Sequence, residues 1–204
     1  QGESNVGRHE EYKYLFRGMI YDWRGRWGKD FPFYYVQIAP YRYTESNISQ
    51  KLRDAQRYAL KVPNSGMVVT LDIGNNNNIH PANKQDVGKR LARLALVNDY
   101  ESTLDPLGPI LQKSQVIDNT IRLEFDNVGF GLINKGDRID QFEIAGSNKQ
   151  YYKGSVTVKK NYVFIYSDSV KNPKFVRYAW SDTPEPSLFN TEGFPSSSFM
   201  VEID

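Results

Sequence analysis

The amino-acid sequence predicts an α/β protein in which a small parallel sheet with crossover helices is followed by an antiparallel β domain. Before about residue 105, segments of helical period alternate with short apolar runs, as expected for a parallel sheet. After it, short alternating segments recur about every ten residues between turn residues, which is typical of a small sandwich. We place the domains at 1–108 and 109–204, with the boundary near the segment from Pro106 to Pro109.

Each element of the first domain rests on its own pattern. Residues 8–27 carry apolar groups at i, i+3, i+4 and i+7, the spacing of an amphipathic helix. Residues 33–39 form a nearly continuous apolar run between two prolines, as in a buried parallel strand. The expected order is a helix over 8–27, a strand over 33–39, a helix over 48–62 that stops at Pro63, a strand over 67–71 and a helix over 83–100.

Two parallel strands are too few for a stable sheet of this kind, because its strands need neighbours on both sides. If Gln1 lies in the turn after a strand, then that strand and one or two earlier ones belong to residues outside this sequence. We therefore expect the chain to be the C-terminal part of a longer protein and to require the N-terminal part of that protein as a partner.

In the second domain the alternating segments predict short strands separated by turns. The tail contains three prolines and the run Ser196-Ser197-Ser198, and we expect it to be an extended segment on the surface. The expected strands cover residues 121–125, 142–145, 155–158, 162–166 and 175–180.

Composition excludes several classes of protein. With 39% hydrophobic and 25% charged residues the chain is an ordinary globular protein, and 26 Lys and Arg against 24 Asp and Glu leave +2, so we expect no nucleic-acid partner. Without cysteine there is no disulfide, thiolate metal site or Cys nucleophile, and we expect neither metal nor cofactor. No run of about 18 apolar residues predicts a membrane span, and no signal-peptide pattern is visible in this sequence.

Two short segments carry residues suited to ester hydrolysis. The segment 1–5, Gln-Gly-Glu-Ser-Asn, and the pair His80-Pro81 both lie where turns follow strand ends, which is where open α/β sheets build their sites. His80 is the candidate base. Gly2 lets the backbone approach a substrate, and the side-chain amide of Gln1 or Asn5 can donate to an oxyanion. Alternatively, segment 1–5 is a capping turn and His80 is a helix-entry residue bonded locally.

The motifs, taken together, resemble the sialate O-acetylesterase family of SGNH-type hydrolases over essentially the whole chain. This resemblance implies a flavodoxin-like (SGNH hydrolase) catalytic domain, of which only part is present here, that removes acetyl esters from sugar hydroxyls. In the family the nucleophilic serine lies in an earlier turn, beyond this N-terminus, so Ser4 is not expected to be the nucleophile. The matching segments are 1–5, 21–24, 31–41, 53–56, 66–74, 79–81, 83–84, 88–91, 142–146, 176–180, 188–190 and 193–195.

One position departs from the family pattern. Relatives place an acid two or three residues before the histidine, where it fixes the imidazole tautomer, but here the residues 75–78 are all Asn. An amide orients a histidine poorly, and an Asp→Asn change in a serine-protease triad costs about 10⁴ in turnover. Either Glu3 or Asp72 takes the role of the acid, or a carbonyl holds His80. Asn78 is a candidate for substrate binding.

Aromatic residues near the strand ends suggest how a sugar could be held. Tyr41 and Tyr43 follow the first strand and can stack on a glycan, whereas Trp23 and Trp27 are expected to pack within the protein.

The sequence thus predicts serine-type hydrolysis of O-acetyl esters on sialic acids or related glycans, with an acetylated glycan as substrate. A non-catalytic glycan-binding or structural protein and an acetylxylan-type esterase are the alternatives. The resemblance also implies a secreted, periplasmic or lysosomal location.

Overall fold

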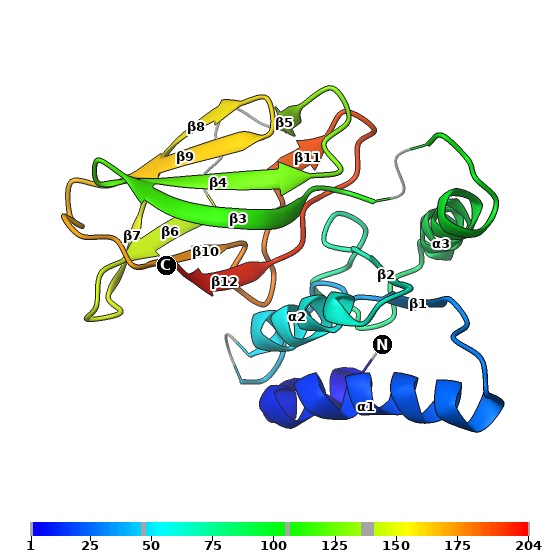
Figure 1. Cartoon of the computed structure of the whole chain (residues 1–204). Helices are drawn as coiled ribbons and strands as arrows, with labels where there is room; N and C mark the ends of the chain where they lie inside the picture. Colours follow the sequence, from blue (N-terminus) through cyan, green and yellow to red (C-terminus); the bar gives the residue numbers. More distant parts are fainter. Residues whose placement is uncertain (1, 46–47, 105–106, 136–140, 204) are drawn as a thin grey trace. The chain divides into compact units, whose positions relative to one another are not determined.

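The computed structural model describes residues 2–45, 48–104, 107–135 and 141–203 (Figure 1). The chain forms two compact units. Unit 1 comprises Gln1–Leu107 and Ser181–Thr183, and unit 2 comprises Gly108–Trp180 and Pro184–Asp204. Residues 181–183, which were expected in the second domain, belong to unit 1.

Unit 1 contains the expected helices and strands, with small shifts of their ends. The second strand begins two residues earlier than expected and ends at Val68, because its pairing with the first strand runs only from Phe33 opposite Ser65 to Val36 opposite Val68. The elements are the 3-10 helix η1 (Glu3–Arg8), α1 (His9–Trp27), β1 (Phe33–Val36), α2 (Ser49–Tyr58), η2 (Ala59–Lys61), β2 (Ser65–Val68) and α3 (Lys84–Asp99).

The parallel sheet of unit 1 has two strands, β1 and β2, within the described ranges. Successive side chains of a strand point to opposite faces, and β1 shows this clearly. Tyr35 packs on Phe16 of α1, with ring centroids 4.9 Å apart, and donates its hydroxyl to the Gln56 carbonyl of α2. Tyr34 instead donates its hydroxyl to Asp99 of α3. Helices α1 and α2 therefore cover one face of the sheet and α3 covers the other.

The N-terminus of α2 is anchored by a residue that is distant in sequence. The Asp182 carboxylate accepts hydrogen bonds from the backbone N–H groups of Ile48 and Ser49, at 3.0 and 2.8 Å, and from the Ser49 hydroxyl at 2.7 Å. A carboxylate at this position satisfies unpaired helical N–H groups and complements the helix dipole.

One turn further along α2, Arg53 is completely buried. Its guanidinium donates to the Ser49 hydroxyl and to the backbone carbonyls of Ser181 and Asp182. Burial lowers the pKa of Arg53 to about 10, and the negative charge of Asp182 opposes this shift. We call these three residues the Ser49–Arg53–Asp182 cluster.

Unit 2 is a sandwich of two antiparallel sheets. One has the order β3-β4-β9-β8, the other β12-β10-β6-β7, and β5 pairs separately with β11. The rings of Phe125 and Phe199, with centroids 6.1 Å apart, join the two sheets in the core. The strands are β3 (Ile110–Ile117), β4 (Thr120–Asp126), β5 (Leu132–Asn134), β6 (Phe142–Ala145), β7 (Tyr151–Lys153), β8 (Ser155–Lys159), β9 (Tyr162–Tyr166), β10 (Phe175–Tyr178), β11 (Leu188–Asn190) and β12 (Phe199–Glu202).

The tail is not the surface segment that the sequence predicted. Strands β11 and β12 are parts of the sandwich, and all three serines of the 196–198 run are buried. They are tolerated because backbone carbonyls accept their protons: the hydroxyl of Ser196 donates to Pro109, and that of Ser198 donates to Ala179. The prediction was wrong because the many prolines and serines of the tail indicated a surface segment, although Leu188 of β11 and Phe199 of β12 are buried in the core.

In the described residues, no helix combines the length and the apolar character needed to cross a membrane. The same residues include no group of three or more His, Cys, Asp or Glu side chains arranged to hold a metal ion.

We predict that Asp182→Ala lowers the free energy of unfolding by about 3 kcal/mol, because it leaves the buried Arg53 charge without a compensating carboxylate and uncaps α2. Chemical denaturation monitored by circular dichroism measures this change. The matched control is Asp22→Ala, which removes an exposed i,i+4 partner of Arg26 and should change stability little. Equal stability of the two variants would contradict the assigned importance of the cluster.

Candidate functional site

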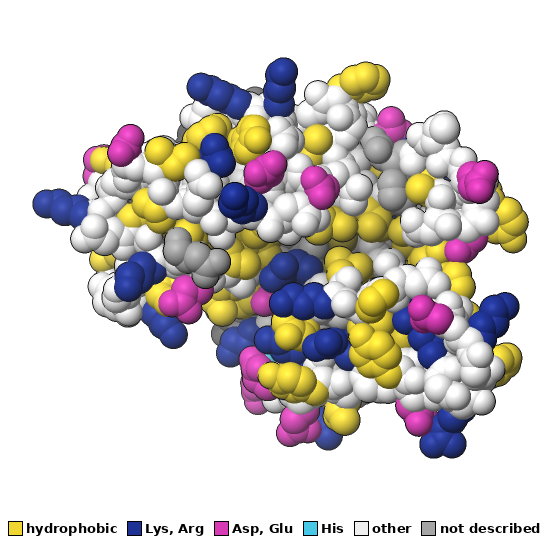
Figure 2. Space-filling model, in the orientation of Figure 1, with side chains coloured by type: hydrophobic (Ala, Val, Ile, Leu, Met, Phe, Trp, Pro, Cys, Tyr) yellow, Lys and Arg dark blue, Asp and Glu magenta, His cyan; other side chains and the backbone are white. Residues whose placement is uncertain are grey.

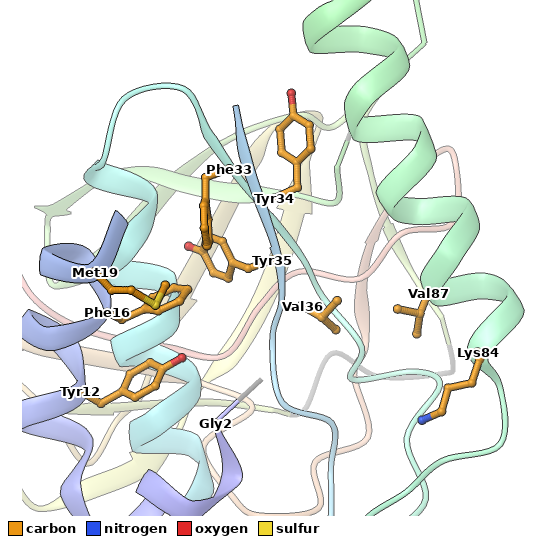
Figure 3. Close-up of a pocket in the computed structure, with 10 residues that line it drawn as sticks. All are labelled: Gly2, Tyr12, Phe16, Met19, Phe33, Tyr34, Tyr35, Val36, Lys84 and Val87. Carbon is orange, nitrogen blue, oxygen red and sulfur yellow. The ribbon is translucent and has the colours of Figure 1, made fainter. Parts of the chain in front are cut away.

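A cavity of about 720 Å³ lies beside β1 in unit 1 (Figure 3). All four residues of β1 line it and no residue of β2 does, so the cavity follows the side of β1 that has no partner strand in the described part of the chain. Its walls come from α1 and α3, which lie on opposite faces of the sheet. The lining residues are Gly2, Tyr12, Phe16, Met19, Phe33, Tyr34, Tyr35, Val36, Lys84 and Val87.

One end of this cavity is lined by Gly2 and by the start of α3, whereas His80 and Pro81 are not among the lining residues. Gly2 belongs to the N-terminal segment, and Lys84 opens α3 four residues after His80. In Figure 3 both lie near Val36, where β1 ends, rather than near Phe33, where it begins. The carboxyl ends of parallel strands are the usual location of sites in such sheets.

Contacts between the loops that follow β1 and β2 hold this end of the sheet together. The backbone N–H of Arg42 donates to the Asn76 carbonyl at 3.0 Å, and the Thr70 hydroxyl donates to the Gln37 carbonyl at 2.9 Å. Gly74 lies so close to Pro40 that an added Cβ would come within 2.5 Å of the proline ring. A side chain at Gly74 would therefore push the Asn-rich loop away from the loop after β1.

The N-terminal segment is a tight turn built on Gly2. This glycine has φ 135°, and an added Cβ would lie 2.8 Å from the ring of Tyr12. Its backbone N–H donates to the Glu3 carboxylate at 3.0 Å, and the Asn5 side-chain amide, a candidate oxyanion donor, donates to the Gly2 carbonyl at 3.3 Å. Gln1, the other candidate donor, lies outside the described residues, and Ser4 is exposed within η1.

His80 is exposed in the turn that leads into α3. Its backbone N–H donates to the Asn78 side-chain oxygen at 2.9 Å, and Asn83 caps α3 by accepting from the N–H of Asp86. In the described part of the chain, the imidazole ring of His80 makes no hydrogen bond. Asn78 therefore holds the backbone of the histidine rather than its ring.

The two candidate acids have different surroundings. Asp72 makes a two-bond ion pair with Arg90, at 2.8 and 2.6 Å, and Arg90 also donates to the Val69 carbonyl. Glu3 accepts from its neighbour Gly2, and its charge raises the pKa of Tyr43, although burial contributes more to that shift. The Asp72 carboxylate is thus paired with the Arg90 guanidinium, whereas the Glu3 carboxylate accepts one hydrogen bond from a backbone N–H.

Tyr41 and Tyr43 form an aromatic pair after β1, with ring centroids 5.0 Å apart and the planes nearly perpendicular. The Tyr41 backbone N–H donates to the Asp182 carbonyl, which ties this loop to the N-terminus of α2. The Tyr43 hydroxyl is buried and has no hydrogen-bond partner in the described residues. Burial, followed by the charge of Glu3, raises its pKa to about 12.

The buried polar residues of α2 were not among the predicted site residues. Gln56 accepts from the backbone N–H of Ile38 at 2.9 Å and donates to the Val36 carbonyl, so its side chain fixes the chain where β1 ends. The Gln37 side chain donates to the Arg53 carbonyl at 2.9 Å. These roles had a signal in the sequence: Ser49, Arg53 and Gln56 form a polar face on a helix that packs against a sheet. Buried polar groups need specific partners.

Comparison with solved structures shows a likeness to an esterase. The chain is similar to XAC1771, a carbohydrate acetylesterase from Xanthomonas citri, with 33% sequence identity and a TM-score of 0.91. The match covers 98% of this chain and 49% of that chain, so this chain spans about half the length of the similar structure. No protein-family profile matches the chain, and no curated protein sequence matches it either.

We predict that Tyr43 loses its proton near pH 12 instead of near 10, because its hydroxyl is buried close to Glu3. The folded state keeps this proton while the unfolded state releases it. Tyr43 therefore contributes stability below pH 10 that is lost as the pH rises towards 12. NMR titration of ¹³Cζ-labelled tyrosine measures the midpoint, and Tyr43→Phe identifies the resonance. A midpoint near 10 would contradict the buried environment.

Proposed function

We propose that this chain is part of an enzyme that hydrolyses O-acetyl esters on glycans. The observation that carries the proposal is the similarity to a carbohydrate acetylesterase over 98% of the chain. The convergence of Gly2 and of the helix that follows His80 at the carboxyl end of β1 supports it. Acetylated sialic acids and related glycans are the proposed substrates, by the family resemblance, and a secreted, periplasmic or lysosomal location belongs to the same proposal.

In the proposed reaction, the nucleophile is a serine of the N-terminal part of the protein, as the family resemblance implies. The serine hydroxyl of the N-terminal part attacks the acetyl carbonyl while His80 removes its proton. The imidazolium then gives this proton to the departing sugar oxygen, and a water molecule releases acetate by the same steps in reverse order. The side-chain amides of Gln1 and Asn5 are the proposed oxyanion donors, and Gly2 lets the backbone approach the substrate. Glu3 is the proposed acid that orients His80, because Asp72 is already paired with Arg90.

We propose that the N-terminal part adds a strand beside β1. In the described residues one edge of β1 is paired with β2, and its other edge exposes backbone groups that a further strand could pair in a regular ladder. The cavity of about 720 Å³ along this edge has apolar walls on both faces of the sheet, including Phe16 on one side and Val87 on the other. This arrangement suits a parallel strand that adds to the sheet between α1 and α3.

A row of apolar side chains on α1 points to the same conclusion. Leu15, Met19, Trp23 and Trp27 follow one another at intervals of four residues, and Leu15, Trp23 and Trp27 are 68, 48 and 79% exposed. Figure 2 shows hydrophobic side chains at the surface in the region of α1. The tryptophans touch Phe33 and Phe31 at their ring edges but are not enclosed. We propose that the N-terminal part covers this row, which we call the α1 stripe.

The observed geometry also gives some support to a non-catalytic glycan-binding protein. The ring of His80 lacks a described carboxylate partner, and Asn78 stands where relatives have an acid. An acetylxylan-type esterase would use the same mechanism on another sugar. The pair of Tyr41 and Tyr43 does not distinguish these alternatives, because an aromatic face can pack against the C–H face of most sugars.

We predict that His80→Ala in the complete protein lowers turnover of 4-nitrophenyl acetate by about 10²–10⁴, the usual contribution of a general base. The matched control is His9→Ala, which removes the second histidine and should leave turnover unchanged. Near-normal turnover in a folded His80→Ala variant would refute the esterase role and favour the glycan-binding alternative.

Two further variants in the same assay separate the candidate acids. If Glu3 orients the imidazole, Glu3→Gln should reduce turnover strongly and Asp72→Asn much less. The opposite order would assign the role to Asp72, despite its pairing with Arg90.

We predict that residues 1–204 alone show no ester hydrolysis and associate with one another through the free β1 edge and the α1 stripe. Size-exclusion chromatography and 4-nitrophenyl acetate turnover test this. Leu15→Gln combined with Trp27→Gln should reduce the association, because it removes exposed apolar area. A cooperatively folded monomer with turnover that Ser4→Ala abolishes would overturn both the partner proposal and the assignment of the nucleophile.

A further inference from the structure

Unit 2 contains a second cavity, of about 440 Å³, that the proposed reaction does not use. Its walls are the loop between β6 and β7 and the loop between β9 and β10. The volume lies within the range of small-molecule sites. All residues that line it belong to unit 2, so the cavity is complete without any other part of the chain.

Internal contacts hold both loops in place. In the first loop the Lys149 N–H donates to the Gly146 carbonyl at 3.0 Å, and the Gln150 N–H donates to the Asn148 side chain at 3.1 Å. In the second loop Val170 is buried, and its N–H donates to the Ser167 carbonyl. The loops approach each other at Gly146, where an added Cβ would lie 3.3 Å from the carbonyl oxygen of residue 172. The cavity is therefore preformed.

Several polar side chains around this cavity make no hydrogen bond within the described part of the protein. In the described residues, the side chains of Ser147, Gln150, Ser169 and Asn172 make no hydrogen bond, although all four line the cavity. Amide and hydroxyl groups of this kind can donate and accept at the same time, as sugar hydroxyls do. Tyr152 adds a half-buried aromatic ring that is not stacked on another ring of the described part.

The charge of the lining argues against other ligand classes. Lys171 and Asp168 contribute one charge of each sign, so the cavity has no excess positive charge to hold a phosphate or a polyanion. The uncommitted amides and hydroxyls would be desolvated without compensation by a purely apolar ligand. The ligand should therefore be uncharged and able to form hydrogen bonds. A neutral sugar meets both requirements, because its hydroxyls can pair with the amides while its C–H face packs on Tyr152.

We propose that this cavity binds a neutral sugar residue of a polysaccharide and holds the protein on its polymer. This second site is separate from ester hydrolysis, and it would exist in either an esterase or a non-catalytic protein. Its affinity for one sugar residue is expected to be weak, with a Kd on the order of 1 mM, since few contacts are made and all are open to water.

Affinity electrophoresis of the complete protein in gels that contain xyloglucan, xylan or galactomannan tests this inference. We expect at least one of these neutral polysaccharides to retard the protein. Tyr152→Ala, and separately Asn172→Ala, should raise the Kd by about tenfold, the equivalent of one lost contact of this size. Gln150→Ala, which changes an exposed side chain and carries little risk to folding, should weaken retardation in the same direction.

The matched control is Tyr100→Ala, which removes an exposed tyrosine of unit 1 and should leave retardation unchanged. All variants should retain the 4-nitrophenyl acetate turnover of the unchanged protein, because this small ester does not need a second site. A protein that is retarded but inactive would refute the esterase proposal alone. Absence of retardation by all three polymers, equal retardation of the Gln150→Ala variant and the unchanged protein, or retardation by polygalacturonate only would overturn the present inference.

Discussion

The Ser49–Arg53–Asp182 cluster is the interaction on which the rest of unit 1 depends. Its carboxylate fixes the start of α2, and α2 in turn holds the chain at the end of β1 through the side chain of Gln56. The backbone carbonyl of Asp182 also accepts a hydrogen bond from the backbone N–H of Tyr41, so the loop that carries Tyr41 and Tyr43 is attached to the cluster as well. Burying a guanidinium costs free energy unless its N–H groups find acceptors. Here the backbone carbonyls of residues 181 and 182 and the Ser49 hydroxyl accept hydrogen bonds from Arg53. Displacing any one acceptor would disturb the helix, the strand end and the aromatic loop together.

The unpaired edge of β1 and the candidate site lie together in unit 1. In the described residues β1 pairs only with β2, and the cavity along β1 is lined at one end by Gly2 and Lys84. In parallel sheets, function is concentrated in the turns after the strands. In the proposed complete protein, a strand added to this edge would therefore supply both a neighbour in the core and a further turn beside the site.

The sequence was sufficient to predict the helices of unit 1, because their apolar residues recur with a strong helical period, and the strands whose side chains alternate, such as β4 and β9. It was insufficient for β11 and β12, where buried serines bonded to carbonyls looked like surface residues. Of the candidate site, the segments around Gly2 and His80 were proposed from expected positions after strands; only the second follows a strand of the structure, β2, and the roles of their residues stay predictions. The role of Asp182 could not be predicted, because nothing in the local pattern relates a residue in the tail to a helix 133 positions earlier.

That separation has a consequence for the order in which the protein can be made. As the chain leaves the ribosome, α2 emerges early, but its N-terminal N–H groups and the charge of Arg53 find their acceptors only after residues 181–183 have been synthesised. At about 5–20 residues per second, the delay for some 130 residues is roughly 10 s. Until then the helix must remain partly solvated or be sheltered by other proteins, since contacts between residues distant in sequence form late. Most of unit 1 thus precedes unit 2 in the chain, and yet unit 1 cannot be the first of the two to finish folding.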